Sequence, residues 1–307
     1  MKTITQDILK TLAYFDYFSY PLTSADICSF ASHKYNQTQI DETLNELTTD
    51  KIIFKLDEFY SLQNKPGLAD KRRKGNQMAV KQMAIAQKVA KLISRFPFVE
   101  TVAVSGSLSK HYADSKTDID FFIITKANRL WIARTLMHLF KKLTYLKGKQ
   151  HWFCMNYYVD ETGMEIPEKN IFTAMEIITL LPMEGLMHFK KFIEANIWTA
   201  NFFPAHKIAS NAKMKIEKGF ICKCFEKIFN SKAGDIIDKW LMIITDKRWK
   251  KKTLAGKLNG HNLKIGMMVN RHFSKPDPRN FQAKVVQQYE IRVKNLLQLK
   301  QATTIIL

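Results

Sequence analysis

The sequence predicts an α+β fold with three parts: a small helical unit that ends in a β-hairpin, a core of helices packed on a small mixed sheet, and a basic helical C-terminal region. Three observations lead to this prediction. In the first 62 residues, apolar side chains recur three times at helical spacing before two short strand-like runs. Between residues 99 and 159, strand-like and helix-like segments alternate. From residue 173 onward the pattern is mainly helical.

The first predicted unit comprises residues 1–62. Its expected elements are a helix over 5–18, a second helix after Thr23 as N-cap, a third helix over 37–49, and strands over 51–56 and 59–62. This order is that of a winged helix-turn-helix domain, whose third helix usually enters the DNA major groove. Here residues 37–50 carry four carboxylates and no Lys or Arg, so the helix would repel a phosphate backbone. A structural or protein-binding role is therefore favoured over sequence-specific DNA binding.

A linker and a helix are predicted over residues 63–98, and the core over residues 99–170. The segment 63–77 is polar and contains Pro66 and Gly67, which favours a linker, and apolar spacing predicts a helix over 78–95. The core is expected to contain a strand over 99–104, a turn at 105–107 with a short helix, a strand over 119–124, a helix over 129–146 and a strand over 152–159. These segments predict helices on one small sheet.

Two features of the core point to phosphate chemistry. Gly106 lies in a Ser-Gly-Ser turn after an apolar strand, where glycine lets a ligand approach the backbone and a following helix offers its N–H groups to an anion. Asp118 and Asp120 open the next strand, and residues two apart on a strand share a face. Both carboxylates would therefore repel each other unless a cation lay between them. Mg²⁺ suits such a pair, because it binds few carboxylates together with phosphate oxygens.

The motif over residues 102–125 resembles that of the polymerase-beta-like nucleotidyltransferase superfamily: an apolar strand, Gly-Ser, a short helix, and Asp-x-Asp before an apolar strand. A looser likeness in element order, from residue 5 to about residue 205, is to small bacterial proteins with a minimal nucleotidyltransferase domain behind a winged helix. The resemblance implies that Gly106 and Ser107 hold the triphosphate of an NTP and that Asp118 and Asp120 bind Mg²⁺. Lys110, one helical turn after Ser107, is either a phosphate contact or a solvated lysine.

The resemblance also implies an activity. A nucleoside monophosphate would pass from an NTP, with ATP the expected donor, to a hydroxyl of a protein, a nucleic acid or a small molecule, and pyrophosphate would leave. The superfamily usually places a third carboxylate in the middle of the strand that corresponds to residues 152–159. Here Asn156 is expected at that third metal position, with Asp160 as the substitute. An amide brings no negative charge, so a catalytically degenerate nucleotide-binding regulator is the alternative.

The C-terminal region, residues 171–307, holds most of the net charge of +20, because residues 205–307 contain 22 basic and seven acidic side chains. An amphipathic helix is expected over 235–252, with one apolar side formed by Ile236, Ile237, Trp240, Leu241 and Ile244. Solvated helix faces, a nucleic-acid backbone with Trp249 stacking on a base, and an anionic membrane all remain open as the reason for the charge. Loops are expected at 182–185, 203–206, 256–260 and 275–278, and a last helix over 279–300 after a cap at Asp277 and Pro278.

Composition excludes several classes of protein. Four scattered cysteines form neither a disulfide framework nor a zinc motif. Asp7 and Asp16 interrupt the first apolar stretch, so we expect no signal peptide. Charged residues and Pro182 interrupt the most apolar stretch, residues 171–203, short of the about 20 residues that span a bilayer, so no transmembrane segment is expected. Together these features predict a cytoplasmic protein.

Overall fold

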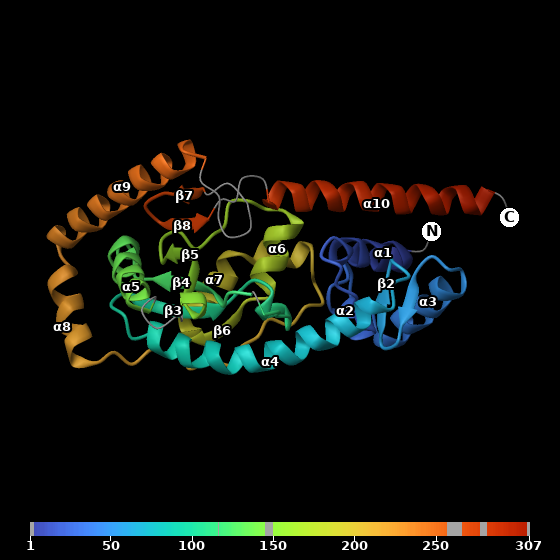
Figure 1. Cartoon of the computed structure of the whole chain (residues 1–307), viewed down its shortest axis with the longest axis horizontal. Coiled ribbons are helices and arrows are strands. Elements are labelled where there is room, and N and C mark those ends of the chain that lie inside the picture. The colour runs from blue at the N-terminus through green and yellow to red at the C-terminus, as the bar shows by residue number, and fades with distance from the viewer. Residues whose placement is uncertain (1–2, 116, 145–149, 257–265, 277–280, 306–307) are drawn as a thin grey trace.

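The computed structural model describes residues 3–115, 117–144, 150–256, 266–276 and 281–305, with Gln150 and the last seven of these described by their backbone alone. The architecture is mixed α+β, with a six-stranded mixed sheet and two long helices, α4 (Gly67–Ile93) and α10 (Phe281–Ile305), that both reach the N-terminal unit (Figure 1). None of the described helices is long and apolar enough to span a bilayer.

The N-terminal unit contains the elements that the sequence predicts. They are α1 (Thr3–Asp16), α2 (Ser24–Ser29), α3 (Gln37–Thr49) and an antiparallel pair, β1 (Phe54–Leu56) and β2 (Phe59–Ser61). The Thr23 hydroxyl accepts a hydrogen bond from the Asp26 amide while the Asp26 carboxylate accepts one from the Thr23 amide, so the predicted N-cap is confirmed as a capping box. Ile40, Leu44 and Leu47 of α3 are buried in the core of this unit.

The linker predicted over residues 63–77 is wrong for most of its length, because α4 already begins at Gly67. Tertiary contacts stabilise these polar turns as a helix. The buried Arg72 guanidinium lies 3.7 Å from the centre of the Tyr20 ring, donates to the Pro21 carbonyl and forms an ion pair with Asp26. The basic residues of this segment thus attach α4 to the N-terminal unit.

The sheet has the strand order β6-β3-β4-β5-β8-β7, and among the strand pairs of the described residues only β4–β5 is parallel. Its strands are β3 (Val99–Val104), β4 (Asp120–Thr125), β5 (Cys154–Asp160), β6 (Leu181–Glu184), β7 (Met267–Val269) and β8 (Phe273–Pro276). Helices α4 and α5 (Leu130–Thr144) pack on one side of the sheet, and α6 (Ile171–Ile178) and α7 (Leu186–Ala195) on the other (Figure 1). The central strands are buried on both sides, which explains their continuous apolar sequences.

The C-terminal region is less purely helical than the sequence predicts. β6 forms where a loop was expected at residues 182–185, and β7 and β8 extend the sheet beside β5. Two helices, α8 (Phe220–Phe229) and α9 (Lys232–Leu254), lie at the end of the core away from the N-terminal unit (Figure 1). α10 then returns to α1, where Arg292 pairs with Asp16. The predicted cap at Asp277 and Pro278 and most of the loop at 256–260 lie outside the described residues.

Candidate functional site

The Gly106 turn and Asp120 lie next to each other because β3 and β4 are antiparallel neighbours. Val104 pairs with Phe121, and the Ser105 amide donates to the Asp120 carbonyl at 2.9 Å. Gly106 adopts φ +68°, and a β-carbon on it would lie 2.8 Å from Oδ2 of Asp120. Glycine is thus required twice at this position, by its backbone conformation and by the side chain that covers it.

Asp118 lies just before β4 and faces a basic group. Its Oδ1 is 2.6 Å from Nδ1 of His151, and both side chains are partly exposed. Asp118 also acts on Asp120. The pKa of Asp120 is raised to about 6, first by burial and then by the charges of Asp118 and Glu176, while the Cys154 thiol and Lys141 oppose the rise. Asp120 is therefore a carboxylate whose negative charge the surrounding protein does not fully neutralise.

On β5, the residue next to Asp120 is Cys154, which carries a thiol. Cys154 pairs in register with Asp120, while Asn156 falls where the β4–β5 register shifts. Burial and the charge of Asp120 raise the pKa of the Cys154 thiol, so it stays protonated. The role of Asn156 as third metal position remains a prediction.

The prediction that Asp160 substitutes for the third carboxylate is wrong. It pairs with Thr125 at the other end of β4, its side chain is fully buried, and it accepts hydrogen bonds from the amides of Asn128, Thr162 and Gly163. His272 lies 3.0 Å from it. These partners give Asp160 a structural role in the loop after β5.

Lys110 is not a solvated lysine, because its amino group is hydrogen-bonded within the protein. Its Nζ donates to the Gly106 carbonyl at 3.1 Å and to Oε1 of Glu176 at 2.8 Å. Glu176, on α6, was missed by the sequence reasoning, although it is the one charged residue of that apolar helix and this signal was available. Glu176 connects α6 electrostatically to both Lys110 and Asp120.

The helix after the Gly106 turn is too short to bind an anion through the dipole at its N-terminus. It is a 3₁₀ turn of three residues, Leu108–Lys110, with Ser107 at its N-cap position. His111 ends it in the left-handed region at φ +57°. Because so few peptide dipoles are aligned, the N–H groups near Ser107 provide hydrogen bonds more than a macrodipole.

The N-terminal unit holds this loop in place. The Tyr20 hydroxyl donates to the Lys110 carbonyl, and the Tyr20 ring meets the Tyr112 ring edge to face at 5.7 Å. Tyr112 also lies over Gly75 of α4, where a β-carbon would come 2.2 Å from its ring. The loop that contains Gly106 and Lys110 is thus fixed by two elements outside the sheet.

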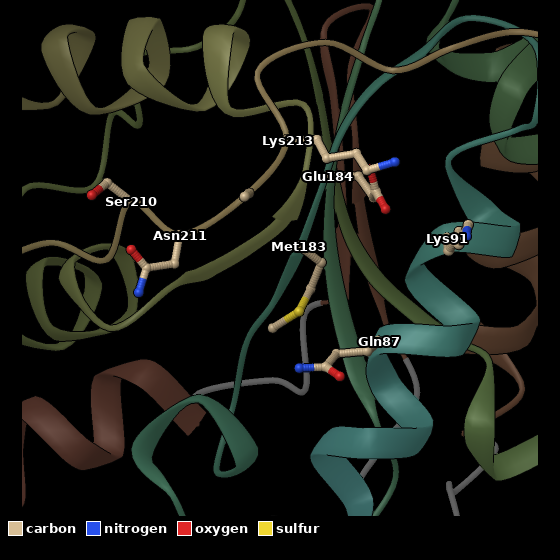
Figure 2. A pocket seen from close by; sticks show the side chains of 8 residues that line it. Gln87, Lys91, Met183, Glu184, Ser210, Asn211 and Lys213 are labelled. Atoms are coloured by element: carbon tan, nitrogen blue, oxygen red, sulfur yellow. The ribbon is translucent and has the colours of Figure 1, made fainter.

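A separate pocket of about 660 Å³ opens between α4 and β6 (Figure 2). It is lined by Gln87, Lys91, Met183, Glu184, Ser210, Asn211, Ala212 and Lys213. None of these is a predicted site residue. The pocket therefore does not coincide with the Gly106 and Asp120 contact.

Asp118 and Asp120 match the oxygen donors that Mg²⁺ prefers. Burial first, and then the charges of Asp118 and Glu176, raise the pKa of Asp120, and a bound cation would favour its ionised form. Within the described part of the chain, no group of three or more His, Cys, Asp or Glu side chains is arranged to hold a metal. The pair still fits Mg²⁺ that is shared with a nucleotide, since phosphates and water then supply the remaining ligands.

Comparisons with known protein families, with curated proteins and with solved structures found no match.

Proposed function

We propose that this protein is a Mg²⁺-dependent nucleotidyltransferase, which transfers a nucleoside monophosphate from an NTP, with ATP the expected donor, to a hydroxyl of an acceptor. The observation that carries the proposal is the contact between Gly106 and the Asp120 carboxylate, with Asp118 two residues earlier. A glycine turn with one carboxylate beside it and a second carboxylate two residues earlier in the chain suits metal-assisted phosphoryl transfer.

The element order supports the same proposal. A helix, a strand with the Gly106 turn, a short helix, a strand opened by Asp120, a helix and a parallel strand follow one another from α4 to β5. We interpret this unit as a nucleotidyltransferase core, and α1 to β2 as a winged helix. The acidic α3 favours a structural or protein-binding role for that winged helix, and α4 links the two units.

In the proposed reaction, an acceptor oxygen forms a bond to the α-phosphorus while the bond from that phosphorus to the bridging oxygen breaks. Pyrophosphate leaves, and the hydroxyl proton passes to solvent. Asp118 and Asp120 would hold Mg²⁺, which when bound supplies positive charge against the phosphate oxygens. Gly106 and Ser107 would bind phosphate oxygens through backbone N–H groups. Lys110 would exchange Glu176 for a phosphate oxygen, because its amino group already lies at the turn.

Incorporation of label from α-labelled NTPs tests the proposal. The full chain is incubated with each NTP, Mg²⁺ or Mn²⁺ and a cell extract that contains acceptors. We expect label in an acceptor with the wild type and none with Asp118→Asn plus Asp120→Asn. Asp114→Asn is the matched control, because this nearby carboxylate accepts from Thr117. Label that survives the double substitution would exclude the proposed site.

One observation favours a second candidate function, a nucleotide-binding regulator without turnover that acts on a nucleic acid or a protein partner. The position beside Asp120 on β5 is a protonated thiol instead of a third carboxylate. This function predicts NTP binding by calorimetry without pyrophosphate release. Pyrophosphate released by the wild type and not by the double variant would contradict it.

A further inference from the structure

Helices α8 and α9, residues 220–254, expose an unusual number of large apolar side chains; we call this pair of helices the arm. Phe220 is 81% exposed, Ile221 85% and Trp240 65%. Of the large apolar side chains that are exposed in the described chain, half belong to the arm. Folded proteins rarely leave apolar side chains so concentrated in water unless they contact something there.

These side chains form continuous stripes along their helices. On α9, Ile236, Trp240 and Ile244 are spaced four residues apart and therefore share one face. On α8, Phe220 and Ile228 share a face in the same way, with Cys224 between them. The sequence predicts this face of α9 as the apolar side; in the structure it points to solvent, and only Leu241 of that set packs against the core.

The other face of each helix attaches the arm to the core. On α8, Glu226 accepts from the Phe98 amide at 2.7 Å. On α9, Asp238 accepts from the Ile132 amide at 2.9 Å, and Asp235 pairs with Arg129. These contacts orient both helices against the core. The apolar stripes are therefore exposed although the arm is attached to the rest of the fold.

The charges of the arm are also segregated: most acidic side chains face the core, and the basic ones face solvent. Three of its four acids are those inward anchors, and the fourth, Asp246, pairs with Lys250. Its basic side chains face solvent beside the apolar stripes; among the exposed ones are Lys223, Lys227, Lys239, Lys247 and Lys251. On α9, Lys247 and Lys251 continue the line of Ile236, Trp240 and Ile244. The outer surface therefore combines aliphatic and aromatic side chains with an excess of positive charge.

We propose that the arm binds the surface of an anionic lipid bilayer, with its apolar stripes among the acyl chains and its lysines at the headgroups. A second copy of the chain would bring the same positive surface against itself, which is unfavourable. A nucleic acid would attract the lysines, but most of the exposed apolar side chains of the arm are aliphatic, and aliphatic side chains cannot stack on bases as aromatic ones do. The free thiols fit a reducing compartment, where the facing leaflet carries anionic lipids. The proposal is independent of the nucleotidyltransferase proposal.

Flotation with lipid vesicles tests the inference on the full chain. We expect the wild type to float with vesicles of phosphatidylcholine that contain about one third phosphatidylserine, and to float at least about ten-fold less with phosphatidylcholine alone. Raising the salt concentration from about 0.05 M to about 0.5 M should weaken the binding, because it screens the lysines.

Two variants separate the apolar and the charged contributions. Ile236→Ser, Trp240→Ser and Ile244→Ser together should lower binding to the anionic vesicles by about ten-fold or more. Val80→Ser, Leu143→Ser and Ile197→Ser, which change three similarly exposed apolar side chains elsewhere, should leave binding unchanged. Lys247→Gln with Lys251→Gln should weaken binding severalfold, and Lys71→Gln with Lys74→Gln on α4 should not.

Tryptophan fluorescence provides a test that does not depend on the folding of the serine and glutamine variants. Vesicles with brominated acyl chains should quench tryptophan fluorescence of the wild type, and Trp240→Phe should remove most of that quenching. The inference is overturned if the wild type does not bind anionic vesicles, or if the arm variant binds as well as its control. It is also overturned if the arm substitutions abolish a dimer or nucleic-acid binding instead of vesicle binding.

Discussion

The carboxylate of Asp120 lies against the α-carbon of Gly106, so that a β-carbon there would be 2.8 Å from Oδ2. Replacing Gly106 by alanine should therefore cost about 1–2 kcal/mol for the left-handed backbone, and more for displacing Asp120. We expect Gly106→Ala to lower the free energy of unfolding by that amount in denaturant titrations and to weaken NTP binding by about ten-fold or more.

Gly256→Ala is the matched control for this prediction. Gly256 also adopts a left-handed conformation, φ +63°, but a β-carbon added to it would have no described atom within 4 Å, so only the backbone cost applies. NTP affinity should not change in this variant. Equal loss of NTP binding in both variants would show that the contact with Asp120 is irrelevant to the site.

At Gly75 we expect the usual effect of a glycine-to-alanine substitution on helix stability to be reversed. An alanine in a helix interior normally stabilises by about 1 kcal/mol relative to glycine. At Gly75 the new methyl group would lie 2.2 Å from the Tyr112 ring, so we expect Gly75→Ala to destabilise and to displace the loop that contains Lys110. Gly67→Ala, at an open position of the same helix, should be neutral or stabilising in thermal unfolding. A stabilised Gly75→Ala variant would contradict the packing of Tyr112 on α4.

Glu176 competes with phosphate for Lys110 if the site binds nucleotides. Glu176→Gln removes a negative charge close to Asp120 and releases the Lys110 ammonium group. We expect this variant to bind an NTP several-fold more tightly in the presence of EDTA, as measured by calorimetry, because like-charge repulsion is reduced. Lys110→Met should weaken the same binding. Weaker binding by Glu176→Gln would instead mean that Glu176 organises the site.

The buried Asp238 carboxyl should make the free energy of unfolding depend on pH. Burial raises its pKa to about 6 from about 3.8, although the amides of Ile132 and Trp131 and the charge of Arg129 oppose the rise and Asp160 adds to it. Between these two values the folded protein binds more protons than the unfolded one, so stability falls as pH rises from about 4 to 6. Asp238→Asn keeps an acceptor for the Ile132 amide and removes the charge.

We therefore expect Asp238→Asn to be more stable than the wild type by about 1–3 kcal/mol at pH 7, with little difference near pH 4. Urea titrations across that range measure the effect. Asp246→Asn, a change of an acid on the same helix that pairs with Lys250 at the surface, should leave the slope of stability against pH unchanged. A slope that Asp238→Asn does not alter would mean that Asp238 is solvated.

Local patterns predicted the elements that have strong periodicity and clear ends. The range of α3 and the range of β3 were predicted to the residue, because apolar spacing, a cap and an uninterrupted apolar strand mark them. The helical state of residues 67–77 was not predicted, since its stability comes from Arg72 on Tyr20 and Asp26. β6 differs from the loop that the sequence predicts because it is a short edge strand that contains Pro182, and such strands form by pairing with a distant neighbour.

By itself the sequence determined the local part of the candidate site: Gly106, Asp118 and Asp120 stand out through spacing, because a turn and a strand register act over a few residues. Only the tertiary structure decided that Glu176 reaches Lys110, that Cys154 adjoins Asp120, and that α9 turns its apolar stripe to solvent. These facts depend on how separate elements pack. A helical period defines an apolar face, but the direction of that face is set by anchors such as Asp238 on the Ile132 amide.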